Sequence, residues 1–345
     1  MWGTQPWAAD VGLYKGGPYI GPRGGKWADP QHKVAWKPES KKRRKKAKEE
    51  PKDKKPSPGT QLPKRVQAKL KKLGVGKLPE ASIPRKDIQL RLDGDPHVAA
   101  VIKWHDTSGR PQSGYTPTFH KRNADKKWAT ILAFSAEHPQ TVRRIMGALK
   151  RAEPGSKEHQ SALVAAIIAK TGLRPGGRQS LAGHYGVSTM TPAHVTIEGS
   201  SVSIDFKGKQ GKQNTATIRS PVIAAALSPY MKGGNKKRKP MFRGKVLDDA
   251  RKLLPEGLKL KDLRTLLATQ VGTKVLNAQP VPTLTGNRAK DKRLLAKALL
   301  AASKHVAKLI NNTPAVARAS YIHPQVFKKW AIERVGADPS LFEEE

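Results

Sequence analysis

Residues 312–324 read Asn-Thr-Pro-Ala-Val-Ala-Arg-Ala-Ser-Tyr-Ile-His-Pro, and this stretch decides how the C-terminal part of the chain is organised. We expect a short helix on each side of Tyr321, with Asn312 as a polar donor ahead of it. A tyrosine hydroxyl, with a pKa of about 10, is a poor nucleophile unless its anion is stabilised. Cations provide that stabilisation, so the rest of the chain is of interest for the positive charge it brings.

The chain is strongly basic. It carries 66 Lys and Arg against 27 Asp and Glu in 345 residues, a formal charge of +39. Residues 1–60 hold 15 Lys and Arg and 6 Asp and Glu (net +9), which leaves a net charge of +30 on the other 285 residues. Such a charge costs self-repulsion that a polyanion partner relieves. Because cations also bind phosphate, the pairing predicts an enzyme that attacks a nucleic-acid backbone with tyrosine, and a merely soluble basic protein is the plainer alternative.

Composition excludes several other classes. The chain has no cysteine, so disulfides, thiolate metal sites and cysteine nucleophiles are excluded. The N-terminus has no basic-then-apolar leader, and no apolar run approaches a membrane span. We therefore expect a soluble monomer with no membrane partner. Its expected location is the cytoplasm, associated with the nucleoid, in a bacterium, or a phage- or virus-encoded equivalent, with a nuclear location as the alternative.

Residues 1–60 are expected to be a disordered basic arm, because their composition buries too little apolar area to offset chain entropy. Residues 16–27 form a turn-rich module containing Gly, Tyr and Trp, for which the sequence suggests no mechanism. Residues 41–48 are a block of like charge. This block fits a nuclear import signal or a nonspecific DNA-binding arm.

Residues 61–125 are expected to form a small β-rich DNA-binding lobe. A helix is predicted at 63–73, strands at 88–92, 99–104 and 115–119, and a turn at 107–110.

Residues 126–345 are expected to form a mostly helical catalytic domain with a small antiparallel β-meander. Apolar spacing becomes helical from about residue 128. The predicted helices are 139–152, 156–170, 221–227, 259–271 and 288–309, and the predicted strands are 193–197, 202–206 and 215–218. The fold class is therefore α+β, with the two lobes forming a clamp around duplex DNA.

Four further residues stand out beside Tyr321. Arg174 follows a helix end in Leu-Arg-Pro-Gly-Gly, and Lys209 lies in the hairpin Phe-Lys-Gly-Lys-Gln-Gly-Lys. Arg264 lies inside Lys-Asp-Leu-Arg-Thr-Leu-Leu, and Asn312 precedes the tyrosine. At these residues the chain resembles the type IB DNA topoisomerases in their small bacterial and viral form. The resemblance extends from about residue 139 to 330, and order, spacing and context agree along it.

The resemblance implies five catalytic residues: Tyr321, Arg174, Lys209, Arg264 and Asn312. The chemistry also stands by itself, because a phosphodiester under attack gains charge that guanidinium groups match. A lysine crowded by other cations has a lowered pKa and can protonate the leaving 5′-oxygen. The resulting 3′-phosphotyrosine keeps the free energy of the broken bond, so neither ATP, metal nor any other cofactor is expected. The expected partner is double-stranded DNA, and the expected DNA-binding residues are Lys207, Lys212, Lys261 and Arg318.

Each residue taken alone has a plainer explanation. Arg174 can cap helix carbonyls, and Lys209 can be a solvated hairpin lysine. Arg264 can be a surface ion-pair partner, and Asn312 an ordinary helix C-terminal residue. A lone tyrosine such as Tyr321 is usually a core or interface residue. Their joint order and spacing favour catalysis.

Two alternative functions remain open. Tyrosine recombinases, or integrases, share the Arg–Lys–Arg–Tyr logic but usually carry histidine where this chain has Lys261, which favours a topoisomerase. Many topoisomerases have histidine at the position of Asn312, so asparagine is a departure that leaves any acid role there in doubt. A non-enzymatic DNA-packaging protein would explain the charge but not the ordered residues. The histidines lack metal-site spacing, and no Gly-Lys-Ser/Thr phosphate loop occurs.

Overall fold

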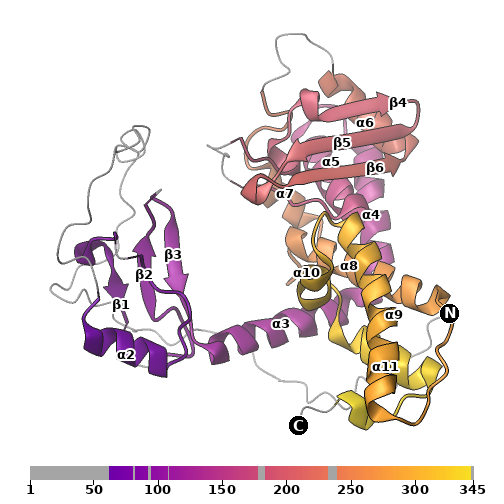
Figure 1. The fold of residues 1–345 in the computed structure, drawn as a ribbon. Helices are drawn as coiled ribbons and strands as arrows, with labels where there is room; N and C mark the ends of the chain where they lie inside the picture. The colour runs from indigo at the N-terminus through magenta and orange to yellow at the C-terminus, as the bar shows by residue number, and fades with distance from the viewer. Residues whose placement is uncertain are drawn as a thin grey trace. The chain divides into compact units, whose positions relative to one another are not determined.

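The computed structural model describes residues 62–80, 82–91, 95–107, 109–177, 183–231 and 239–342. The predictions for the arm and its two segments lie outside these residues. The chain divides into two compact units, and the boundary between them falls between Lys126 and Lys127 (Figure 1).

The described part of the first unit is a three-stranded antiparallel sheet with one helix. Helix α2 (Lys64–Lys72) is followed by β1 (Gln89–Leu90), β2 (Ile102–His105) and β3 (Pro111–Gly114), in the order β1-β2-β3. Alternating burial along β2 places Ile102 and Trp104 in the core. The core brings one face of α2 onto the sheet and consists of Leu62, Val66, Leu70, Val75, Ile83, Ile88, Leu90, Val101, Ile102 and Trp104.

The strand predicted at 115–119 is wrong, because a helix begins there. Helix α3 (Pro117–Ser135) has proline in its first position, and the Thr116 hydroxyl accepts a hydrogen bond from the Phe119 amide at 3.2 Å. The Tyr115 ring stacks on the Phe119 ring, with centroids 4.3 Å apart. A capping threonine followed by proline starts a helix. Helix α3 crosses the boundary between the two units and ends in the second.

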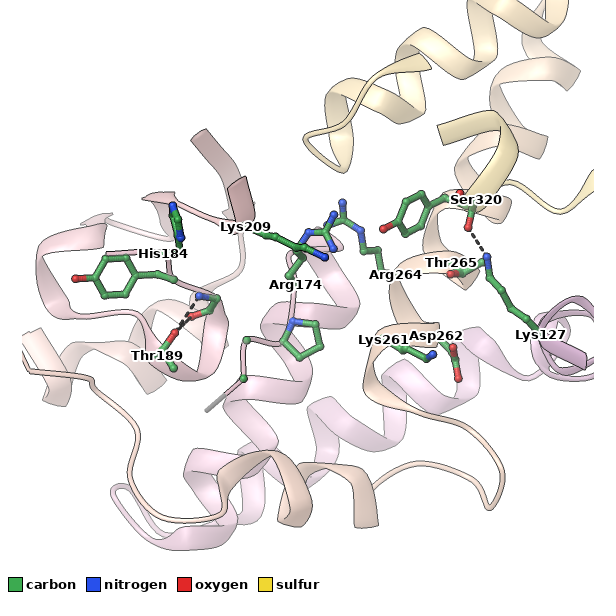
Figure 2. A pocket seen from close by; sticks show the side chains of 16 residues that line it. Lys127, Arg174, His184, Thr189, Lys209, Lys261, Asp262, Arg264, Thr265 and Ser320 are labelled. Carbon is green, nitrogen blue, oxygen red and sulfur yellow. Dashed lines mark hydrogen bonds between the residues drawn. The ribbon is translucent and has the colours of Figure 1, made fainter. Parts of the chain in front are cut away.

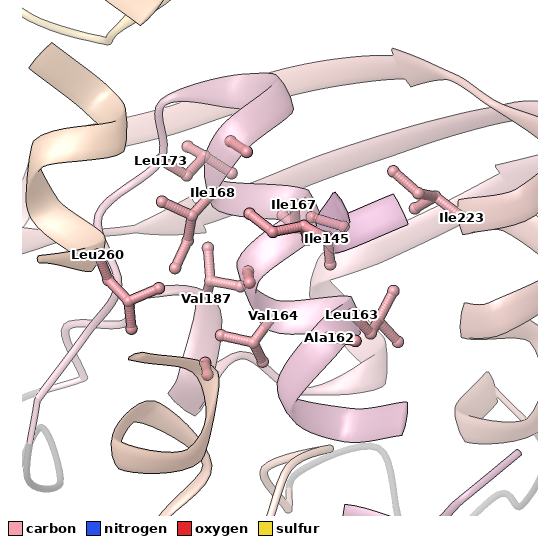
Figure 3. Packing of buried hydrophobic residues seen from close by; sticks show 14 of the residues in the cluster. Ile145, Ala162, Leu163, Val164, Ile167, Ile168, Leu173, Val187, Ile223 and Leu260 are labelled. Carbon is pink, nitrogen blue, oxygen red and sulfur yellow. The ribbon is translucent and has the colours of Figure 1, made fainter. Parts of the chain in front are cut away.

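The second unit is built around α5 (Lys157–Thr171). Ser156 caps its first turn by accepting from the His159 amide, and Gly172 ends it in the left-handed conformation at φ 64°. Eleven of its fifteen residues are buried, because other elements pack around most of the helix. Figure 3 shows this packing, and the neighbours of α5 include α4 (His138–Arg151), α6 (Pro221–Met231), α7 (Val246–Lys252) and α8 (Leu260–Ala278).

The predicted β-meander is present and antiparallel. It consists of β4 (Val195–Glu198), β5 (Ser201–Lys207) and β6 (Gln213–Arg219), in the order β4-β5-β6. Alternate residues of β5 are buried, with Val202, Ile204 and Phe206 facing the core. Helix α5 packs against β6, and α6 packs against β5 (Figure 1).

The C-terminal helices complete the unit. Helix α9 (Arg288–Leu309) is followed by the short α10 (Pro314–Ser320) and by α11 (Pro324–Val335), so Tyr321 lies between two helices as predicted. The structure thus has the predicted α+β class, mostly helical with two small antiparallel sheets. Among the described residues, no helix has both the length and the apolar character needed to cross a membrane.

Candidate active site

A cleft of about 590 Å³ lies within the second unit and gathers residues from across its length. Its lining includes four of the five expected catalytic residues, namely Arg174, Lys209, Arg264 and Tyr321. Figure 2 shows the side chains of Arg174, Lys209 and Arg264 among those that line the cleft. These four residues, which span 147 positions of sequence from Arg174 to Tyr321, therefore share one cleft.

Arg264 is the most buried of these cations, with 2% of its surface exposed. Its two terminal nitrogens donate to the backbone oxygens of Gly172 and Ile310, while its Nε–H is buried without a hydrogen-bond partner. Burial lowers the pKa of Arg264, the neighbouring Tyr321 raises it, and the Arg174 charge lowers it. A buried N–H without a partner is unusual in a folded protein.

Tyr321 is placed by the end of α10, whose C-cap it forms. Its amide donates to the Ala317 backbone oxygen at 3.0 Å, and its backbone carbonyl oxygen accepts from the Thr269 hydroxyl at 3.2 Å. The centroid of its ring lies 4.8 Å from the guanidinium carbon of Arg264. The ring of Tyr321 is therefore held directly over a buried positive charge.

Arg174 lies on a loop that is bonded tightly to a second loop. The Val187 amide donates to the Arg174 oxygen at 3.0 Å, and the Ser188 amide donates to the next oxygen along the chain at 2.9 Å. The backbones of Gly176 and Gly186 meet here so closely that a Cβ on Gly186 would lie 2.4 Å from the Gly176 Cα. Glycine at both positions is what allows the approach that fixes the Arg174 backbone.

Lys209 is exposed and is carried by the connection between β5 and β6. The Gly208 amide donates to the Lys212 oxygen at 2.8 Å, which closes the connection. The buried Asn214 side chain donates to the same oxygen, also at 2.8 Å. Because the hairpin is closed, the backbone of Lys209 is fixed while its long, exposed side chain can adjust to the position of a substrate atom.

Asn312 is not among the residues that line the cleft. Its side-chain oxygen accepts from the Thr313 amide at 3.2 Å, in the turn between α9 and α10. Its neighbour Asn311 has a positive φ of 51° and bonds to β6, donating to the Thr215 oxygen at 2.9 Å and accepting from the Thr215 amide at 3.1 Å. The catalytic role of Asn312 stays a prediction.

The four expected DNA-binding residues lie at different places. Lys261 is exposed and lines the cleft, three residues before Arg264 on α8. Lys207, Lys212 and Arg318 are exposed but are not part of the cleft lining. Their contacts with DNA stay predictions.

Sequence reasoning missed Lys127, which also lines the cleft. Its ammonium donates to the backbone carbonyl oxygen of Ser320, which is the residue directly before Tyr321 (Figure 2). The signal was present in α3: Lys127 precedes the fully buried Ile131 by four residues, so the two share a helix face. Lysine on a buried helix face is uncommon unless it has a partner.

The described residues contain no group of three or more His, Asp or Glu side chains placed to hold a metal ion. The positive charge in the cleft comes from Arg174, Arg264, Lys127, Lys209 and Lys261.

A cleft lined by a tyrosine and several cations is suited to bind a phosphate group. Comparison with known protein families shows the family to which the chain belongs. Residues 116–338 match the family described as the catalytic core of eukaryotic DNA topoisomerase I. Because the match covers more than half of the chain, the chain belongs to this DNA topoisomerase I family. The resemblance read from the sequence is confirmed.

The other comparisons are more distant. Two crystal structures of the XerH site-specific recombinase bound to difH DNA, one post-cleavage and one pre-cleavage, are similar at 16% and 15% identity. The TM-score is 0.33 for each, with 55% and 56% of this chain covered and 50% and 52% of theirs. The chain thus spans about half the length of these recombinase chains. No match was found among curated proteins.

Proposed function

We propose that this protein is a type IB DNA topoisomerase that relaxes supercoiled DNA through a transient 3′-phosphotyrosine. The observation that carries the proposal is the placement of the Tyr321 ring 4.8 Å from the buried Arg264 guanidinium, in a cleft that also holds Arg174 and Lys209. Family membership supports it independently.

The arginines provide the binding site for the reacting phosphate. A phosphodiester under attack gains negative charge on its nonbridging oxygens, and guanidinium groups bind such oxygens with matching geometry. Arg264 and Arg174 both line the cleft and would supply two guanidinium groups for this contact. Asn312 is proposed to donate a further hydrogen bond, which requires the turn before α10 to present its amide to the bound phosphate.

The reaction exchanges one phosphate ester for another. Tyr321 loses its phenol proton to solvent and its oxygen attacks phosphorus, while the bond from phosphorus to the 5′-oxygen breaks. Lys209 donates a proton to the departing 5′-oxygen, which leaves as a hydroxyl. The reverse steps reseal the strand, and because the number of phosphate ester bonds is unchanged, no nucleotide fuel is needed. The positive charge that other nucleases take from metal ions is provided here by arginine.

Duplex DNA is the proposed substrate. The formal charge of +39 supports this, because neutralising phosphates releases counterions and drives binding. Between cleavage and resealing, the free 5′-end rotates under torsional stress. Supercoils of either sign are therefore expected to relax.

The test is incubation of the full chain with supercoiled plasmid in EDTA, without ATP, followed by trapping with detergent. Relaxation is expected, with a protein–DNA adduct that maps to Tyr321. Tyr321→Phe should form no adduct and should still bind the plasmid, because only the hydroxyl is removed. An adduct in that variant, or plasmid that stays supercoiled with the unmodified protein, contradicts the proposal. Exchange of strands between two duplexes would instead indicate a recombinase.

A further inference from the structure

The middle of α3 contacts the segment that carries the proposed nucleophile, Tyr321. The Lys127 ammonium donates to the backbone carbonyl oxygen of Ser320, which is 193 residues away in the sequence (Figure 2). The same ammonium lies 4.0 Å from the Trp128 ring centroid and 5.8 Å from the Tyr321 ring centroid. It therefore touches the last residue of α10 and approaches the ring that follows it.

Trp128 contacts the other side of the same segment. Its ring meets the His323 ring edge to face, with centroids 5.2 Å apart, and His323 is buried at 6% exposure. The Nδ1 atom of His323 accepts from the Gln325 amide at 3.1 Å and so caps the start of α11. Two adjacent residues of α3 thus hold the chain immediately before and two residues after Tyr321.

The surroundings of Lys127 are costly for a cation. Burial lowers the pKa of Lys127, the Asp262 charge raises it and the Lys261 charge lowers it. Removing an ammonium from water is unfavourable unless it gains hydrogen bonds or favourable ring contacts. The Ser320 oxygen belongs to the last turn of α10, where the carbonyls carry partial negative charge, so the contact is electrostatically favourable.

We propose that Lys127 is a positioning residue for Tyr321: by binding the Ser320 oxygen it holds the end of α10 so that the phenol stays beside Arg264. This inference rests on the proposed function, because it assumes that Tyr321 is the nucleophile. The proposed role of Lys127 is distinct from the reaction itself, since Lys127 takes part in no chemical step. Loss of the contact frees the Tyr321 backbone at one of its anchors and leaves the two cations of the phosphate site in place.

The experiment uses Lys127→Met and Lys127→Arg in the full chain. Methionine keeps the apolar stem and volume while removing the donor and the charge, so the fold is expected to survive. Arginine keeps a donor that can reach the Ser320 oxygen. Lys150→Met, at an exposed position in the last turn of α4, is the matched control for loss of one lysine from the second unit.

Two quantities are measured for each variant with enzyme in excess of supercoiled plasmid. The first is the rate at which detergent-trapped adduct forms, and the second is DNA affinity, measured in a Tyr321→Phe background that blocks cleavage. Lys127→Met is expected to slow adduct formation by about 10 to 100-fold, since misplacement by about 1 Å has effects of that order. Its DNA affinity should change less than about threefold, by the same reasoning that only the reacting geometry is lost. Lys127→Arg should restore most of the rate, and Lys150→Met should match the unmodified protein.

Three results would overturn the inference while the unmodified protein still forms its Tyr321 adduct. These are a Lys127→Met rate equal to that of the unmodified protein, an equal loss in the methionine and arginine variants, or a loss of DNA affinity as large as the loss of rate. The last would make Lys127 a DNA contact. If the unmodified protein forms no Tyr321 adduct, the proposed function fails, and this inference fails with it.

Discussion

The contact between two glycines makes Gly186→Ala a sharp test of how Arg174 is placed. A Cβ on Gly186 would lie 2.4 Å from the Gly176 Cα, 2.5 Å from the Gly176 nitrogen and 3.0 Å from the Arg174 oxygen. All three are backbone atoms, so no side chain can rotate out of the way. Ordinary van der Waals contact begins at 3.4 Å, and the loops must therefore separate by about 1 Å.

That separation has two measurable consequences. Forcing a methyl group into a closed contact costs about 1–3 kcal/mol of unfolding free energy. Moving the base of Arg174 by about 1 Å misplaces its guanidinium, and a shift of that size lowers a catalytic rate by about 10²-fold. The first is measured by urea unfolding, and the second by the rate of adduct formation on supercoiled plasmid.

Gly177→Ala is the matched control, because a Cβ there meets no atom of the described residues within 4 Å. It lies on the same loop, so any general sensitivity of the loop to alanine will show in both variants. We expect Gly177→Ala to stay within about threefold of the unmodified rate, which is less than one missing transition-state contact removes. If Gly186→Ala cleaves as fast as Gly177→Ala, the backbone contact does not set the position of Arg174, and the reasoning is refuted.

Two other predictions concern proton transfer and pH. Lys209→Ala should slow cleavage of ordinary DNA by about 10²- to 10⁴-fold. The same variant should cleave a 5′-bridging phosphorothiolate at nearly the unmodified rate, since a thiolate leaves without a proton. An equal loss of rate on both substrates argues against proton donation by Lys209. Burial lowers the pKa of His138 and of His323. Protons therefore bind the unfolded chain more strongly, and unfolding free energy should fall as pH drops through about 6.5 and below. Urea unfolding at pH 7.5 and 5.5 checks this, and replacing both histidines by glutamine should reduce the dependence.

Local signals in the sequence account for much of the fold. Helix α5 was predicted because apolar residues recur at helical spacing over residues 156–170, and in the structure Ser156 and Gly172 cap its two ends. The strand predicted at 115–119 failed for a physical reason: its aromatic and β-branched residues favour a strand, but Thr116 caps a helix. A side chain bonding to the backbone outweighed the propensity of the residues around it.

The site was predictable to the extent that its residues lie in recognisable motifs. The order of the motifs along the chain predicted that Arg174, Lys209, Arg264 and Tyr321 form one site. The structure places all four in the lining of one cleft. Lys127 escaped because its contact spans 193 residues and lies outside every motif. Motif order also carries no information on which way a turn faces, and so it did not foresee that Asn312 would lie outside the cleft lining.

The side chain of Asn311 links the segment before Tyr321 to the meander that carries Lys209. Its side chain bonds to both the amide and the carbonyl oxygen of Thr215, on the strand that follows the loop bearing Lys209. Its positive φ is one that asparagine tolerates better than most residues with a side chain, whereas glycine would adopt it but could not make the bonds. These hydrogen bonds join the turn before α10 to the meander, so the proposed nucleophile Tyr321 and the proposed proton donor Lys209 are carried on segments that are bonded to each other's neighbours.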